Sequence, residues 1–266
     1  KGDPMKIRTC AVAGVFYPRD PHHLEQVLGK FFHGKETGLD ARGIVAPHAG
    51  YPYSGEVAAW AYSAIPASFA GTFILVGPSH RGFGTCISRI AWETPLGIVD
   101  IDPEIADALD IKIDEVSHLE EHSLEVQVPF IKYRFPRTRI VPILMGDQGY
   151  KSASLLAERV LDALRRTNRD DVRLIASSDF SHYVPAAQAR ENDRYAIAAL
   201  DDLDIPAFYR RVAERGVSAC GVGPIAVVCL VCRALGARRG QLLHYATSGD
   251  VTGDPTVVGY GAVAVM

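Results

Sequence analysis

Three short apolar segments of the chain each lead directly into a side chain that can bind a metal ion. The segments and the residues that follow them are 43–47 with His48, 73–76 with His80, and 172–176 with Asp179 and His182. Apolar runs of this length, stopped by Gly, Pro or Ser, are typical of strands buried on both faces of a parallel sheet. Because ligands bind beyond the carboxyl ends of such strands, we expect these side chains to share one site.

The order of the predicted elements indicates an α/β fold. A helix is expected between the first two of these strands, and a β-α-β order implies parallel strands with a right-handed crossover. We therefore predict a single domain over residues 5–266, with a mostly parallel central sheet flanked by helices. We take residues 1–4, which precede Met5, as a remnant outside the fold.

The other elements follow from local signals. Asp20-Pro21 predicts a helix start, Ser54 is expected to cap a helix that reaches about residue 65, and Pro95 and Gly97 favour a hairpin at a sheet edge. Further helices and strands are expected at these positions: helices from Asp102-Pro103, over 118–134, 152–166, 186–200 and 205–215 and up to Leu235, and strands over 140–145, 242–248 and 256–266.

Composition excludes some classes of function. A net charge of −3 without a basic cluster argues against nucleic-acid binding. Apolar runs fall short of the ~20 residues needed to cross a membrane, so we expect no membrane partner. The five cysteines are odd in number and irregularly spaced, which favours a reducing, cytoplasmic setting over a disulfide framework.

Four histidines lie on turn-like segments rich in Gly, Pro or Ser, and they are His48, His80, His122 and His182. Loops held by a rigid sheet are where catalytic residues concentrate. Neutral imidazoles that converge would suit a divalent transition metal. Taken singly, each could equally be a histidine that forms structural hydrogen bonds.

Cys220 and Asp179 are further candidates. Cys220 lies between Ala219 and Gly221, ahead of a predicted helix whose N-terminus would favour a thiolate, although a buried structural cysteine is the simpler alternative. Asp179 beside His182 could fix the tautomer of that imidazole and raise its basicity, or it could cap a turn.

Two shorter motifs predict less. The spacing His118-Leu-Glu-Glu-His122 matches one class of zinc proteases. The apolar alternation that follows it argues against the continuous helix that such a site needs. Cys229 and Cys232 form a Cys-x-x-Cys pair inside an apolar run, which predicts a buried helix face rather than a zinc site.

Taken together, the motifs resemble the MEMO family, whose prokaryotic members are also labelled AmmeMemoRadiSam system protein B. The matching stretches run in order along nearly the whole chain and are 13–18, 46–51, 53–55, 77–80, 93–97, 121–125, 177–183, 219–221, 247–250 and 258–260. The resemblance implies a fold similar to class III extradiol (LigB-type) dioxygenases. It also implies a metal pocket at His48, His80 and Cys220, with Asp179 and His182 close by.

The family implies more than one function. Its animal relatives are known as adaptors in cell motility that bind phosphotyrosine peptides, and as redox proteins that bind copper or iron. Non-haem iron oxygenases use two histidines and a carboxylate, whereas the third position here would be Cys220. A thiolate is softer, and it shifts the preference toward Cu(I) or zinc while iron remains an option.

Three functions therefore compete. The first is a redox or oxygen-chemistry enzyme for a small aromatic substrate, with iron or copper more favoured than zinc and with His182, Asp179 and His122 as catalytic residues. The second is a metal-free enzyme with Cys220 as nucleophile. The third is a binding module with a vestigial metal site that recognises a peptide or partner protein through aromatic anchors, which are Tyr17, Tyr51 and Tyr53.

Overall fold

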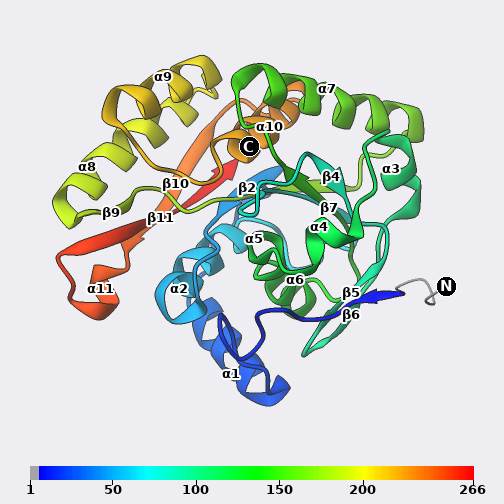
Figure 1. Ribbon diagram of the computed structural model, residues 1–266, viewed down its shortest axis with the longest axis horizontal. Helices are drawn as coiled ribbons and strands as arrows, with labels where there is room; N and C mark the ends of the chain where they lie inside the picture. The colour runs from blue at the N-terminus through cyan, green and yellow to red at the C-terminus, as the bar shows by residue number, and fades with distance from the viewer. Residues whose placement is uncertain (1–5) are drawn as a thin grey trace.

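The computed structural model describes residues 6–266 (Figure 1), so the remnant expected at residues 1–4 lies outside the described residues. The strands are β1 (Ile7–Arg8), β2 (Gly43–Ala46), β3 (Thr72–Pro78), β4 (Cys86–Ile87), β5 (Ala91–Thr94), β6 (Gly97–Val99), β7 (Arg139–Met145), β8 (Val172–Ser177), β9 (His182–Pro185), β10 (Gly240–Thr247) and β11 (Thr256–Val265). The helices are α1 (Pro21–Phe32), α2 (Tyr51–Tyr62), α3 (Pro103–Ala108), α4 (Glu115–Leu119), α5 (His122–Glu125), α6 (Val128–Arg134), α7 (Tyr150–Thr167), α8 (Ala186–Ile197), the 3-10 turn η1 (Ala198–Leu200), α9 (Ile205–Arg215), α10 (Val222–Ala234) and α11 (Gly249–Thr252).

The main sheet has the strand order β10-β11-β2-β8-β3-β7-β4, and β9 joins it by pairing with β11. The inner strands β2, β8, β3 and β7 run parallel, as predicted. The outer pairings are antiparallel, so the expected α/β fold is confirmed but the sheet is mixed rather than mostly parallel. β10 and β11 follow each other along the chain through a connection too short for the crossover that parallel strands require.

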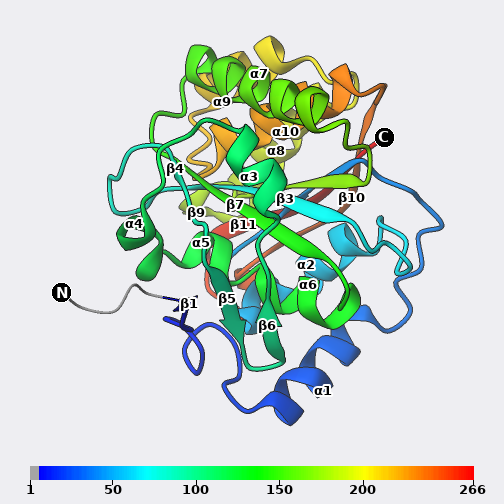
Figure 2. The same ribbon diagram turned by 90° about the vertical axis from the view of Figure 1, so that its right-hand side faces the viewer.

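Helices cover both faces of this sheet. On one face α10 packs against α7 and lies over β8 and β3, while α8 and α9 extend the same layer (Figure 2). On the other face α2 packs on β2, β10 and β11, with α1 behind it. With helices on both faces, β3 is buried along its whole length, from Thr72 to Pro78, which is why its sequence reads as a continuous apolar run.

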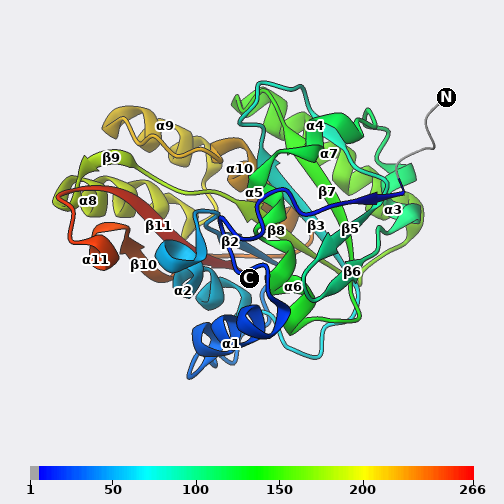
Figure 3. The same cartoon turned by 60° about the horizontal axis from the view of Figure 1, so that its bottom comes forward.

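A second, smaller sheet holds the N-terminal strand. β5 and β6 form the antiparallel hairpin predicted around Pro95 and Gly97, and β1 pairs in parallel with β5 (Figure 3). The hairpin therefore belongs to its own three-stranded sheet instead of the edge of the main one. This pairing brings β1 beside the segment that carries α4 and α5, where Arg8 donates to the carbonyl of His118.

Helix starts follow their local signals with one exception. Asp20 caps α1 and Asp102 caps α3, each accepting a hydrogen bond from a backbone N–H in the first turn, as predicted. The expected cap at Ser54 is wrong, because α2 already begins at Tyr51 after Gly50. The hydroxyl of Ser54 instead donates to the carbonyl of Ala49.

The segment 118–134 forms three short helices, α4, α5 and α6, instead of one kinked helix. His118 lies in α4 and points at Cys86, whereas His122 begins α5. The zinc-protease arrangement, which needs both histidines on one helix face, is therefore absent, as the sequence pattern indicated. Cys229 and Cys232 are fully buried on α10, which confirms the apolar interpretation of that pair.

Candidate metal centre

Three neighbouring strands of the main sheet end side by side, and the predicted site residues that follow them lie close together. β2, β8 and β3 are adjacent, and His48, Asp179 and His80 follow them by two residues each. The ring centroids of His48 and His80 lie 5.2 Å apart, nearly perpendicular to each other. The predicted convergence of these side chains at the carboxyl edge of the sheet is therefore confirmed.

His48, His80 and His122 form a group, here called the histidine cluster, whose ligand atoms all lie within 4.8 Å of one another. His122 comes from the first residue of α5, and its ring stacks on His80 with centroids 4.6 Å apart. The sequence suggested a catalytic role for His122, and its position also fits a metal ligand. Cys220 is not a member of this group, so its role as third ligand stays a prediction.

Cys220 nevertheless touches the cluster. Its Sγ lies 3.2 Å from Nε2 of His48 and accepts a hydrogen bond from the backbone N–H of Asp179 at 3.2 Å. The residue precedes Gly221, which caps α10. A Cβ at Gly221 would lie 2.5 Å from the carbonyl oxygen of Ser177, so only glycine lets this turn approach the end of β8.

Asp179 is buried behind His48. Its Oδ1 accepts a hydrogen bond from the backbone N–H of His48 at 2.8 Å, and its Oδ2 lies 4.0 Å from Nε2 of the same residue. Burial is the main cause that raises the pKa of this carboxyl, to about 6. Asp179 thus holds the turn that carries His48.

His182 begins β9 at the edge of the site. Its Nδ1 lies 2.8 Å from the carbonyl oxygen of Ser218, and its backbone N–H donates to the hydroxyl of the same serine. A carbonyl only accepts, so Nδ1 carries the proton and Nε2 keeps a lone pair in the neutral ring. The next residue, Tyr183, has a φ of 57° and is 78% exposed, a strained backbone of the kind that concentrates at functional sites.

Burial lowers the pKa of two histidines of the cluster. The pKa of His48 lies well below its ordinary value, first because of burial and then because of His80 and His122. Burial and His80 also lower the pKa of His122. Burial, followed by the charge of Asp179, raises the pKa of the Cys220 thiol. Neutral imidazoles are what a metal needs, whereas a protonated thiol disfavours Cys220 as a metal-free nucleophile.

Two residues that sequence analysis did not assign hold the rings in place. Glu121, almost fully buried, accepts from Nδ1 of His80 at 2.8 Å and from its backbone N–H at 2.7 Å. Ser177, the last residue of β8, contacts Nδ1 of His48 at 2.9 Å. Glu121 lies in one of the stretches that resemble the MEMO family, but no local pattern pairs it with His80.

The position of α5 depends on a residue without a side chain. A Cβ at Gly77, near the end of β3, would lie 2.6 Å from Cδ2 of Leu124. The hydroxyl of Ser123 also donates to the carbonyl of Pro78. Glycine at this point therefore lets α5 rest directly on the end of β3, which brings His122 beside His80.

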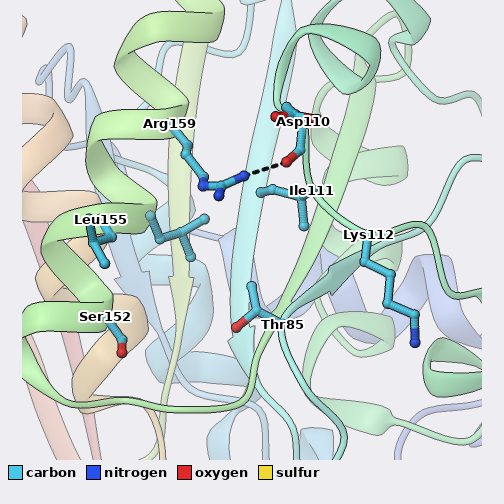
Figure 4. Close-up of a pocket in the computed structure, with 8 residues that line it drawn as sticks. Thr85, Asp110, Ile111, Lys112, Ser152, Leu155 and Arg159 are labelled. Atoms are coloured by element: carbon cyan, nitrogen blue, oxygen red, sulfur yellow. Dashed lines mark hydrogen bonds between the residues drawn. The ribbon is translucent and has the colours of Figure 1, made fainter.

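A separate pocket lies elsewhere on the molecule. It measures about 430 Å³ and is bounded by α7 and the segment 110–112 (Figure 4). Arg159 reaches across it and donates to the carbonyl of Asp110. Lys112 pairs with Asp114. No histidine of the cluster lines this pocket, so the volume and the candidate chemistry are in different places.

Comparison with known proteins agrees with these features. The model of the family described as "Memo-like protein" matches residues 8–264. A MEMO1 family protein of Methanosarcina acetivorans is 45% identical over 269 residues, covering 98% of this chain and 100% of that protein. Those of Methanosarcina barkeri (43% identical, 97% and 100% covered) and Methanothermobacter thermautotrophicus (44% identical, 96% and 98% covered) are also similar.

In the described residues, no helix combines the length and apolar character that crossing a bilayer requires. The match to the family model extends over all but the ends of the chain. The order of the motifs, the α/β fold and the relatives at 43–45% identity agree with one another. This chain belongs to the Memo-like protein family.

Proposed function

We propose that this protein binds one transition-metal ion at the histidine cluster and uses it for redox or oxygen chemistry on a small aromatic molecule. The observation that carries the proposal is the group of His48, His80 and His122, with ligand atoms within 4.8 Å of one another and with at least two rings neutral by burial. Imidazole donors suit iron, copper and zinc. Iron or copper agrees best with redox chemistry.

The surrounding residues have roles that follow from their contacts. A bound ion would supply Lewis acidity or a redox couple at this edge of the sheet. His182, with its Nδ1 proton engaged by Ser218, offers Nε2 to accept a proton from a substrate hydroxyl. Phe16, whose ring lies 4.8 Å from His122, and the exposed Tyr183 provide aromatic surfaces for a flat substrate.

Metal analysis tests the proposal. Protein purified without oxygen should hold close to one equivalent of metal, and the double variant His48→Ala, His80→Ala should hold only background. Arg159→Ala, at the pocket of Figure 4, is the matched control and should keep the wild-type content. Wild-type protein that stays at background after anaerobic reconstitution with Fe²⁺ and with Cu⁺ would overturn the proposal. A catechol-type substrate screen on the loaded protein then tests the reaction.

The third ligand is the next question. Cys220 contacts His48 through Sγ, while His122 completes the cluster. Cobalt(II) distinguishes them, because a thiolate ligand gives an intense near-ultraviolet charge-transfer band that imidazoles do not give. Loss of this band in Cys220→Ser but not in His122→Ala assigns Cys220 as ligand. A wild-type spectrum without the band excludes Cys220 as a ligand.

A binding module is the second candidate. Of the predicted aromatic anchors, Tyr17 and Tyr51 are buried, whereas Tyr53 is exposed, as is Tyr183 next to His182. Exposed aromatic residues are typical anchors of protein interfaces. A peptide or protein captured by the wild type and lost in a Tyr53→Ala, Tyr183→Ala variant, without turnover of any aromatic substrate, would favour this function.

A further inference from the structure

Ser177 has a single proton, and its neighbours determine where that proton goes. Its Oγ lies 2.6 Å from the carbonyl oxygen of Ser123, which only accepts. The side-chain amide nitrogen of Gln127 lies 2.9 Å away and also faces the carbonyl of Pro47, so it is a donor. Ser177 therefore donates to Ser123 and accepts from Gln127. The remaining contact, with Nδ1 of His48 at 2.9 Å, must be donated by the histidine.

Glu121 determines the other ring in the same way. Its Oε2 accepts the backbone N–H of His80 at 2.7 Å, and its Oε1 accepts the backbone N–H of Ser123 at 2.9 Å. A carboxylate engaged by two backbone donors presents only lone pairs to Nδ1 of His80, which lies 2.8 Å from Oε1. His80 must therefore carry its proton on Nδ1 as well.

His122 differs from these two histidines. Its Nδ1 lies 3.6 Å from Oε1 of Glu121, which is too long for a hydrogen bond. The proton of its neutral ring is therefore free to occupy either nitrogen. Both constraints on the other rings also meet at one residue of α5, because Ser123 accepts from Ser177 through its carbonyl and donates to Glu121 through its N–H.

We propose that Ser177 and Glu121 are positioning residues that preset the Nε2 lone pairs of His48 and His80 for a metal ion before the ion arrives, while His122 is not preset. This inference rests on the proposed function, and it adds how the chain prepares the site. Partners of this kind fix the ring orientation and tautomer of ligating histidines. Their loss generally weakens metal binding by about 10- to 100-fold.

The first test uses metal-free protein labelled with ¹⁵N. Long-range ¹H–¹⁵N spectra of the imidazoles should show the Nδ1–H tautomer for His48 and His80 and a mixture for His122. An Nε2–H tautomer at His48 or His80 in the wild type would overturn the proposal. This readout needs neither a metal nor a substrate.

The second test removes each partner. Glu121→Gln has one acceptor oxygen where three N–H groups need acceptors, so the tautomer population at His80 should shift toward Nε2–H. Ser177→Ala should release His48 in the same manner. Both variants should bind Zn²⁺ about 10- to 100-fold more weakly than the wild type. Unchanged tautomers together with unchanged zinc affinity would overturn the proposal.

The chain contains a matched control pair. Ser88 and Glu115 are hydrogen-bonded to each other at 2.7 Å, and Glu115 also accepts the backbone N–H of Arg89. Ser88→Ala and Glu115→Gln should lower stability without changing the imidazole spectra or the zinc affinity. Wild-type protein that binds no metal would overturn the proposed function. Variants that keep wild-type tautomers while the wild type binds zinc would overturn only the inference about Ser177 and Glu121.

Discussion

Helix α5 contributes to two polar clusters that use their hydrogen-bonding groups in opposite ways. One is the histidine cluster. The other, here called the ion-pair cluster, joins Arg8 of β1 to Glu125 at 2.7 Å, with both side chains 1% exposed. Glu125 also accepts hydrogen bonds from the hydroxyl of Tyr17 and from the backbone N–H groups of Ala11 and Val12. Arg8 donates to carbonyls of α4 and its C-terminal turn.

The difference separates a structural cluster from a binding cluster. In the ion-pair cluster each charge faces several partners, so nothing is left over for a ligand. In the histidine cluster the Nδ1 atoms of His48 and His80 are engaged as donors, so the Nε2 atoms keep lone pairs, and that of His48 faces Sγ of Cys220. Lone pairs that a ligand can use, rather than burial or charge alone, mark the candidate site.

The largest expected effect comes from breaking the ion pair. Arg8→Met leaves Glu125 buried without its charged partner, and we expect the free energy of unfolding to fall by about 3–5 kcal/mol. Urea denaturation measures it. Arg173→Met, which removes a pair with the exposed Asp40, is the control and should cost within about 1 kcal/mol. Equal losses in the two variants would contradict the structural role of the ion-pair cluster.

The second-largest effect is expected at the histidine cluster, where a bound metal ion should stabilise the folded protein. Free Zn²⁺ at 100 times its dissociation constant should raise the free energy of unfolding of the wild type by about 2.7 kcal/mol. His48→Ala should lose this gain, whereas folded Arg8→Met should keep it. Denaturation curves with zinc and with a chelator provide the measurement. A gain that survives in His48→Ala would place the binding site elsewhere.

The pH dependence of stability tests the comparison at His118, because this residue is a buried histidine next to the ion-pair cluster. Burial, followed by the charge of Arg8, lowers its pKa from 6.5 to about 4. Between these values the unfolded chain binds the extra proton, so stability falls as the pH drops from 6.5 to 4, by up to about 1.4 kcal/mol per unit from this residue. His118→Gln should flatten the slope measured by urea denaturation, and His23→Gln should not. Identical slopes in all three proteins would argue against this assignment.

The smallest effect is expected at the pocket of Figure 4. Its polar groups are partnered within the chain, as in the ion-pair cluster, but they are exposed. Arg159→Ala should therefore change the free energy of unfolding by no more than about 0.5 kcal/mol. Metal content should stay at the wild-type value. A loss of bound metal in this variant would show that the pocket and the histidine cluster are coupled.

Local patterns in the sequence were enough to predict most helices and strands and the place where the candidate metal ligands lie close together. Strand ends are marked by apolar runs and by Gly or Pro, and adjacency of parallel strands then brings His48 and His80 together. The antiparallel insertion of β11 between β10 and β2 was not predictable, because strand order depends on packing across the whole chain.

The residues that support the two clusters could not be predicted from the sequence either. Arg8 and Glu125 are 117 positions apart, and Ser177 and His48 are 129 apart. Serine and glutamate are common surface residues, so neither draws notice until the fold shows its partner. His122 was recognised as a site residue from its turn-like surroundings, but its place beside His80 depends on how α5 rests on β3.

Two glycines, one in β3 and one at the start of α10, have a consequence for recognising such centres in other chains. Gly77 and Gly221 donate no atom to a ligand, yet Gly221 allows a close backbone approach to Ser177, and Gly77 leaves room for the side chain of Leu124. A relative could have different ligand residues, and so a different chemistry, while keeping glycine at both positions. Searches for similar metal sites in other proteins, and attempts to design one, should therefore give a required glycine as much weight as a coordinating side chain.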